Sequence, residues 1–88
     1  MSLSVMDHYV EITTKKGKSL VLMRLGDAMR EVGDTAGVQI HRSHWVAVDA
    51  VKGVSRGDGK ATVTLVDGRS LPVSRGFMEE AKKAGLVV

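Results

Sequence analysis

The chain has no cysteine, one proline and only three aromatic residues, one each of Phe, Trp and Tyr. Without cysteine, neither disulfides nor thiolate metal sites can form, so stability must come from a packed core. The apolar runs are only a few residues long, too short for a membrane-spanning helix. So few aromatic rings offer little surface on which unpaired bases could stack. A barrel that binds single-stranded nucleic acid is therefore not favoured.

The length and charge of the chain indicate one small globular domain with a basic half. It has 88 residues, of which 43% are hydrophobic and 26% charged, and a net charge of +3. Residues 1–41 carry five basic and five acidic side chains, whereas residues 42–88 carry eight basic and five acidic ones. Because the whole excess lies in the second half, an anionic partner is favoured there.

The first residues do not resemble a secretion signal. Residues 1–6 lack the basic start and the long apolar stretch of a signal peptide. We interpret residues 1–6 as a linker or cloning scar and place the folded domain at residues 7–88. Together with the absence of cysteine, this favours a cytoplasmic location.

The first half of the chain predicts two strands followed by a helix. Apolar and polar residues alternate over 8–14, a charged turn follows at 15–18, and the second strand covers 19–25. The run 20–23 is apolar enough to predict burial on both faces. Four apolar residues then follow helical spacing and predict a helix of about two turns over 26–33. They are Leu25, Ala28, Met29 and Val32.

The second half predicts further short strands and a closing helix. Strands are expected near 38–40, 44–48 and 50–56, with a hinge near Asp49. A tight turn is expected at 57–59 and a two-residue type I′ turn at Asp67-Gly68. Ser74 is expected to cap a C-terminal helix that Gly85 closes. The predicted fold is mainly β, an arrangement of antiparallel sheets with one short mid-chain helix and a short C-terminal helix.

Catalytic and metal-binding motifs are absent from the sequence. The three histidines have no cysteine or neighbouring carboxylate that would complete a metal site. The serines stand outside any G-x-S-x-G context, and the glycines follow no phosphate-loop pattern. We therefore expect no enzyme activity, no metal and no cofactor. Trp45 stands among valines and is expected in the core.

Two arginine–serine elements are the strongest functional signal. Arg42-Ser43 and Ser74-Arg75 each end a strand-like run. A guanidinium can bridge the O6 and N7 atoms of guanine, and a nearby hydroxyl can donate to a phosphate. Together the two elements indicate a DNA-binding module. The run 15–18 is either a solvated hairpin tip or a second contact to phosphate, through Lys16.

These elements give the chain a resemblance to the LytTR family, the DNA-binding output domain of many bacterial response regulators. The resemblance covers residues 7–86 and implies an elongated arrangement of antiparallel sheets around one short helix. Many members have Val-Asn where this chain has Val46-Ala47, and positions 44 and 45 here are His and Trp. The quoted family elements, in order, are Asp7-His8-Tyr9-Val10, Leu25, Asp27-Ala28, Val38-Gln39-Ile40-His41-Arg42-Ser43, Val46, Val51, Val54, Asp67-Gly68-Arg69 and Leu71-Pro72-Val73-Ser74-Arg75.

The resemblance also implies a mechanism and a biological setting. Family members insert loops into successive major grooves, bind imperfect direct repeats in promoters and bend the DNA. Carried over, His8, Arg42 and Arg75 would contact bases. The chain would act as a transcriptional regulator in a two-component system, fused to a regulatory or membrane sensor domain. The expected contacts to the DNA backbone are Ser43, Ser74, Lys82 and Lys16.

Two further expectations concern partners. Direct repeats need no two-fold axis, so we expect a monomer in solution and two copies on tandem sites of double-stranded DNA. The alternative from another class is a small β module for protein–protein contact, with its basic half facing an acidic partner.

Overall fold

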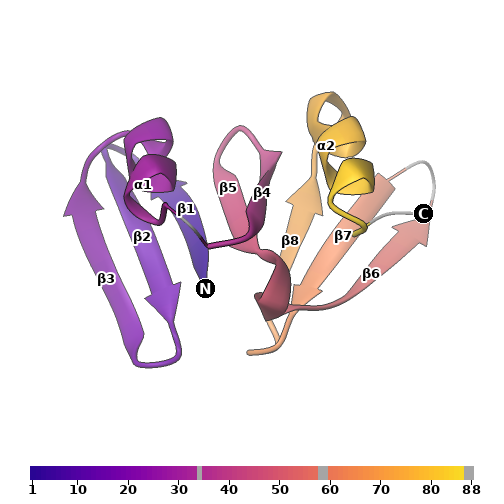
Figure 1. Ribbon diagram of the computed structural model, residues 1–88, viewed down its shortest axis with the longest axis horizontal. Coiled ribbons are helices and arrows are strands. Elements are labelled where there is room, and N and C mark those ends of the chain that lie inside the picture. Colours follow the sequence, from indigo (N-terminus) through magenta and orange to yellow (C-terminus); the bar gives the residue numbers. More distant parts are fainter. Residues whose placement is uncertain (34, 58–59, 87–88) are drawn as a thin grey trace.

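The computed structural model describes residues 1–33, 35–57 and 60–86, and these form two antiparallel sheets and two short α-helices (Figure 1). The molecule measures 34 × 24 × 24 Å, so the prediction of an elongated, mainly β fold is confirmed. The strands are β1 (Ser2–Met6), β2 (Tyr9–Thr14), β3 (Gly17–Leu22), β4 (Gly37–His41), β5 (His44–Ala47), β6 (Val51–Gly57), β7 (Lys60–Leu65) and β8 (Ser70–Val73).

The first sheet has five strands in the order β3-β2-β1-β5-β4, so its central strand is β1. We expected residues 1–6 to be a linker or cloning scar outside the folded unit. Instead, β1 pairs with β2 on one side and β5 on the other, and Leu3 is fully buried. The segment escapes detection because Ser2 and Ser4 alternate with its apolar residues and are nevertheless buried, at 1% and 8% exposure. Small hydroxyl side chains carry little hydrophobic signal.

The second sheet contains β6, β7 and β8 in sequence order. A short 3₁₀ turn (Val48–Ala50) carries the chain from β5 into β6, which confirms the predicted hinge near Asp49. β6 and β7 pair through to Gly57 and Lys60. The tight turn predicted at 57–59 lies partly outside the described residues.

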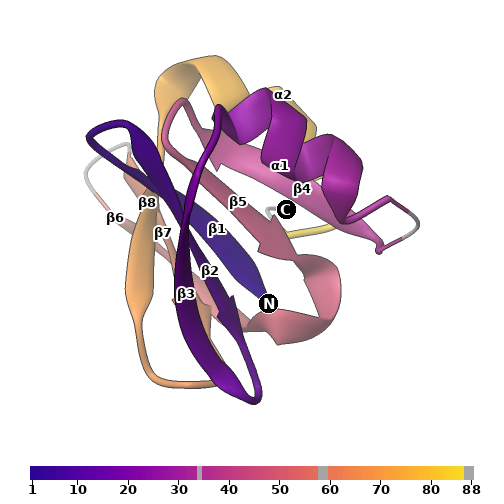
Figure 2. The same ribbon diagram turned by 90° about the vertical axis from the view of Figure 1, so that its left-hand side faces the viewer.

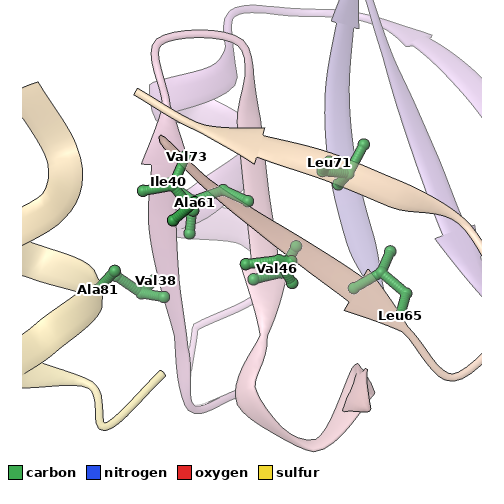
Figure 3. Close-up of a cluster of buried hydrophobic side chains, with 9 residues drawn as sticks. Val38, Ile40, Val46, Ala61, Leu65, Leu71, Val73 and Ala81 are labelled. Atoms are coloured by element: carbon green, nitrogen blue, oxygen red, sulfur yellow. The ribbon is translucent and has the colours of Figure 1, made fainter. Parts of the chain in front are cut away.

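The hairpin of β4 and β5 lies between two hydrophobic cores. Val38, Ile40 and Val46 face the three-stranded sheet, where Figure 3 shows them gathered with Ala61, Leu65 and Val73. Trp45 points the other way, into a core with Leu3, Val10, Leu25 and Ala28. Its 4% exposure confirms the prediction that this tryptophan is a core residue.

Strand β3 differs from its prediction. The run 20–23 was expected to be buried on both faces, but Leu20 is 58% and Leu22 68% exposed. The reason is topological: β3 is an edge strand, and among the described strands it pairs with β2 alone. Residue type alone does not tell a central strand from an edge strand.

Both helices lie close to their predicted positions. α1 (Leu25–Glu31) packs Leu25 and Ala28 against the first sheet. A 3₁₀ turn (Arg75–Phe77) precedes α2 (Met78–Lys83), so the chain turns helical right after β8. Ser74 stands at the N-cap of this turn but makes no capping hydrogen bond through its side chain, contrary to expectation.

The end of α2 is closed as predicted. Gly85 adopts a φ of +80°, and its N–H donates to the carbonyl of Lys82. The N–H of Leu86 donates to the carbonyl of Ala81, which completes a Schellman motif. Leu86 then packs against the core between the sheets.

The turn between β7 and β8 is not of the predicted type. A type I′ turn needs a positive φ at both central residues, but Gly68 has a φ of +93° and Asp67 is not left-handed. Leu65 instead pairs with Arg69, and the Gly68 N–H donates to the Leu65 carbonyl at 2.9 Å. This is a three-residue loop in which one left-handed glycine follows the turn. The hairpin was predicted correctly, but its loop is one residue longer.

Gly68→Val should destabilise the domain by about 1 kcal/mol or more, because a β-branched residue resists a positive φ. The free energy of unfolding in urea measures the effect. Gly53→Val is the matched control, because Gly53 has no positive φ and open space where a Cβ would stand. Equal stability of the two variants would contradict the proposed strain at Gly68.

Gly37 is required by its contact with Trp45. A Cβ placed on Gly37 would lie 2.1 Å from Cζ2 of the indole and 2.6 Å from the carbonyl oxygen of Val46. The indole therefore lies directly on the backbone of β4. No L side chain fits there without moving Trp45.

Gly37→Ala should cost about 1–3 kcal/mol of stability, as overpacking of a core does. Gly53→Ala serves as the control. Tryptophan fluorescence during urea unfolding reports both stability and displacement of the indole. A Gly37→Ala protein with wild-type stability and an unchanged emission maximum would refute the close contact.

Candidate nucleic-acid interface

Three turns lie on one side of the molecule, the upper side in Figure 1. The β1–β2 turn carries His8, the β4–β5 turn carries Arg42 and Ser43, and the segment after β8 carries Ser74 and Arg75. His8, Arg42 and Arg75 are all exposed. The structure thus brings to one side the three residues that the sequence singled out for base contact.

Two backbone hydrogen bonds link the β4–β5 hairpin to the strand before the β1–β2 turn and to the segment after β8. The N–H of Val5, at the end of β1, donates to the carbonyl of Ser43 at 2.8 Å. The N–H of Ser74 donates to the carbonyl of Ile40 at 2.9 Å. The β4–β5 turn is therefore anchored to both of its neighbours, and one bond crosses from the second sheet to the first.

The position of His8 depends on the preceding residue. Asp7 has a φ of +55°, and among the described residues no other non-glycine has a positive φ. Aspartate tolerates this conformation better than most residues, and it closes the tight turn between paired Met6 and Tyr9. An open depression beyond the turn is lined by both His8 and Arg42, together with Arg24.

A second hollow lies between the β4–β5 turn and the segment after β8. Its lining includes His41, Lys60, Ser74 and Arg75. The Ser43 N–H donates to Nδ1 of His41 at 3.1 Å, which places the proton of the neutral ring on Nε2. His41 thus fixes the turn that carries Arg42 and borders the hollow at Arg75.

His44 forms a second, partly buried histidine position under the turn. Its Nδ1 shares a hydrogen bond of 2.8 Å with the hydroxyl of Ser4, and its ring centre lies 5.1 Å from that of His41. Burial lowers the pKa of His44 below its usual 6.5, and the charges of His41 and Arg69 lower that pKa further. The neutral form of His44 is therefore the one that the fold favours.

The depressed pKa of His44 gives stability a defined pH dependence. Because the unfolded chain binds the proton more readily, the free energy of unfolding should fall as the pH drops below 6.5. His44→Asn, which keeps a polar group near Ser4, should reduce this fall. Urea unfolding at pH 7.5 and at about pH 5.5 measures the difference.

His8→Asn is the control for this prediction, because it changes an exposed histidine in a turn. It should keep the wild-type dependence on pH. If His44→Asn also kept it, the acid sensitivity would not arise from His44.

Two of the predicted backbone contacts lie elsewhere. Lys16 is in the β2–β3 turn, at the opposite end of β2 from His8, so the structure does not bring it together with the three turns. Six residues of extended strand separate those ends by roughly 20 Å. Lys82 is exposed near the end of α2, on the helix that follows Arg75.

Sequence reasoning missed Arg24 and Lys60 as candidate site residues. Arg24 precedes α1, and Lys60 begins β7. Each is far in sequence from the arginine–serine elements that it borders in space. Only their basic character was visible beforehand, which does not separate them from other surface cations.

Comparisons with known proteins give the family and the fold of the chain. The LytTr DNA-binding domain family matches residues 1–85 of the chain. The solved LytTr DNA-binding domain of a Bacillus cereus protein, described as a methyl-accepting/DNA response regulator, superimposes with a TM-score of 0.83. The two are 18% identical, and the match covers 96% of this chain and 78% of that one. Among curated proteins, none matches this chain.

The fold is thus that of a small two-sheet β domain with three turns that carry exposed basic side chains on one side. The chain belongs to the LytTR family of DNA-binding domains. The family match begins at residue 1 and so includes β1. Within the described residues, no helix is long and apolar enough to cross a membrane.

Proposed function

We propose that this domain binds double-stranded DNA sequence-specifically by placing its three linked turns in successive major grooves, and that it regulates transcription. The observation that carries the proposal is the pair of hydrogen bonds that link the β4–β5 hairpin to β1 and to the segment after β8, Val5 to Ser43 and Ser74 to Ile40. Linked turns keep a fixed spacing between their side chains. Fixed spacing is what reading several bases at once requires.

Base reading is assigned to the exposed side chains of the turns. Arg42 and Arg75 can each form two hydrogen bonds to the edge of a guanine, and His8 can donate to a purine acceptor. All three lie beyond the ends of strands, where a side chain can enter a groove without moving the scaffold. Arg75 is the residue chosen for the test. It is exposed and is the first residue of the 3₁₀ turn that follows β8.

Phosphate contacts are assigned to the groups around the two hollows. Ser43 and Ser74 flank the base-reading arginines, and Lys60 and Arg24 add positive charge at the hollows. Lys82 stands further along, on the exposed side of α2, and would reach only the outer phosphates. Such contacts set the register of a protein on the duplex without carrying sequence information. Lys16 is left out because it lies at the other end of β2.

The proposed setting follows the family. Two monomers would fill imperfect direct repeats in a promoter in the same orientation, as the output module of a response regulator in the bacterial cytoplasm. A fused regulatory or membrane sensor domain would supply the signal. No catalytic activity is proposed.

Arg75→Ala should weaken binding to a specific duplex by about 1–3 kcal/mol and relax preference at one base position. A phosphate contact behaves differently: its loss weakens all sequences equally and lowers the salt slope by about one unit. Titrations on specific and scrambled duplexes at several salt concentrations separate the two. The specific duplex is obtained by selection from random sequences.

Lys60→Ala should show the phosphate pattern, and Lys52→Ala, on the exposed face of β6, is the control that should change neither affinity. If Arg75→Ala kept the ratio of specific to scrambled affinity, Arg75 would not be a base reader. If the wild-type protein bound no duplex at all, the proposed function itself would fail.

A further inference from the structure

The outer hairpin of the first sheet exposes an apolar patch that begins beside the β1–β2 turn. It consists of Met6, Tyr9, Leu20 and Leu22, which are 50%, 46%, 58% and 68% exposed. Tyr9 pairs with Met6 on one side and Leu22 on the other, so these three form one row across three strands. Leu20 lies two residues from Leu22 in the same strand, so both point to the same face.

Three lysines stand at the end of this patch. Lys15 and Lys16 form the β2–β3 turn, and Lys18 shares the face of Leu20 and Leu22 by the two-residue period of a strand. On that face Glu11 faces Arg69 at 4.0 Å. Asp67 of the β7–β8 turn lies within electrostatic reach of Lys18, and Lys15 lines a hollow with Asp49 and Asp67. The patch is therefore apolar along the strand and positive at the start of β3.

The backbone beside this patch is also available. β3 is the outermost strand, paired with β2 alone, and in Figure 2 it lies nearest the viewer. One edge of β3 consequently presents a row of N–H and C=O groups to solvent. An extended peptide satisfies such a row by adding a strand, and side chains at alternate positions give specificity.

We propose that β3 is a docking edge for an extended segment of a partner protein, which pairs antiparallel to β3. Alternate apolar residues of the segment would cover Leu20 and Leu22. Acidic residues near its C-terminal end would meet Lys15, Lys16 and Lys18. The patch borders the β1–β2 turn, and its Leu22 also lines the depression beside His8 and Arg42.

The observations favour this occupant over three others. A lipid surface would cover the leucines but leave the strand edge without hydrogen-bond partners. DNA phosphate would suit the lysines but not an apolar row. A second copy of the chain would bring together two molecules that each carry +3.

The test uses two synthetic peptides that alternate Val and Thr, one with a C-terminal run of Glu and a matched one with a C-terminal run of Lys. In NMR titrations of the wild-type domain, the Glu peptide should shift the amide signals of residues 17–22, and the Lys peptide should not. The double variant Leu20→Thr/Leu22→Thr should bind the Glu peptide about tenfold more weakly. Lys18→Glu should bind the Glu peptide no better than the Lys peptide.

Two matched controls keep the result specific. Val66→Thr alters an exposed apolar residue outside the patch, and Lys52→Glu alters an exposed lysine of the other sheet. Both should bind the Glu peptide as the wild type does. Lys18→Glu keeps the proposal testable even if the double leucine variant is unstable.

Several results would overturn the proposal. Equal binding of the two peptides, or shifts confined to residues outside β3, would remove the docking edge. Sedimentation that shows a dimer lost in Leu20→Thr/Leu22→Thr would make a second copy the occupant. If the wild type bound vesicles of anionic lipid and the same variant did not, the occupant would be a membrane surface. If Lys18→Glu bound duplex DNA more weakly and Lys52→Glu did not, the lysines would be DNA contacts rather than peptide contacts.

Discussion

The β4–β5 hairpin is the element on which the rest of this structure depends, because it takes part in both cores at once. Val46 faces the three-stranded sheet, and its neighbour Trp45 faces α1 and β1. A shift of one residue in register would exchange those two side chains between cores of different shape. The indole on Gly37 opposes such a shift, because no other residue there leaves room for it. Packing therefore fixes the hairpin, and the hairpin fixes its turn.

The β4–β5 turn then sets the positions of β1 and of the segment after β8. The carbonyl groups of Ile40 and Ser43 accept hydrogen bonds from the second sheet and from β1, so elements far apart in sequence meet at this one place. His41 holds the turn from within through the Ser43 N–H. A site built in this way is as rigid as the cores beneath it, although its side chains stand on loops. Stability and recognition are thus coupled through a few backbone groups.

Much of the fold could be predicted from the sequence, since period and turn residues report local structure. The helix at 25–31, the hinge near Asp49 and the glycine that closes α2 all followed from such signals. The predictions that were wrong concern residues whose burial depends on which strands lie beside them. Ser2 and Ser4 are buried because β1 is central, and Leu20 and Leu22 are exposed because β3 is at an edge. Likewise Arg24 and Lys60 join the site only through the fold, and no local pattern marks them.

The two ends of β2 show how one small domain can divide its surface. At the end near His8, polar and charged groups stand on turns above the partly buried His41 and His44 and a packed hairpin. At the other end, lysines stand at the start of β3, an edge strand that pairs with β2 alone among the described strands. Charge alone would treat both ends as suited to an anion. The end with the lysines differs because Leu20 follows Lys18 on the same face of a strand with an open backbone edge. Duplex DNA is bound mainly through cations at fixed spacing, whereas an added polypeptide strand is also held by apolar contact and backbone pairing.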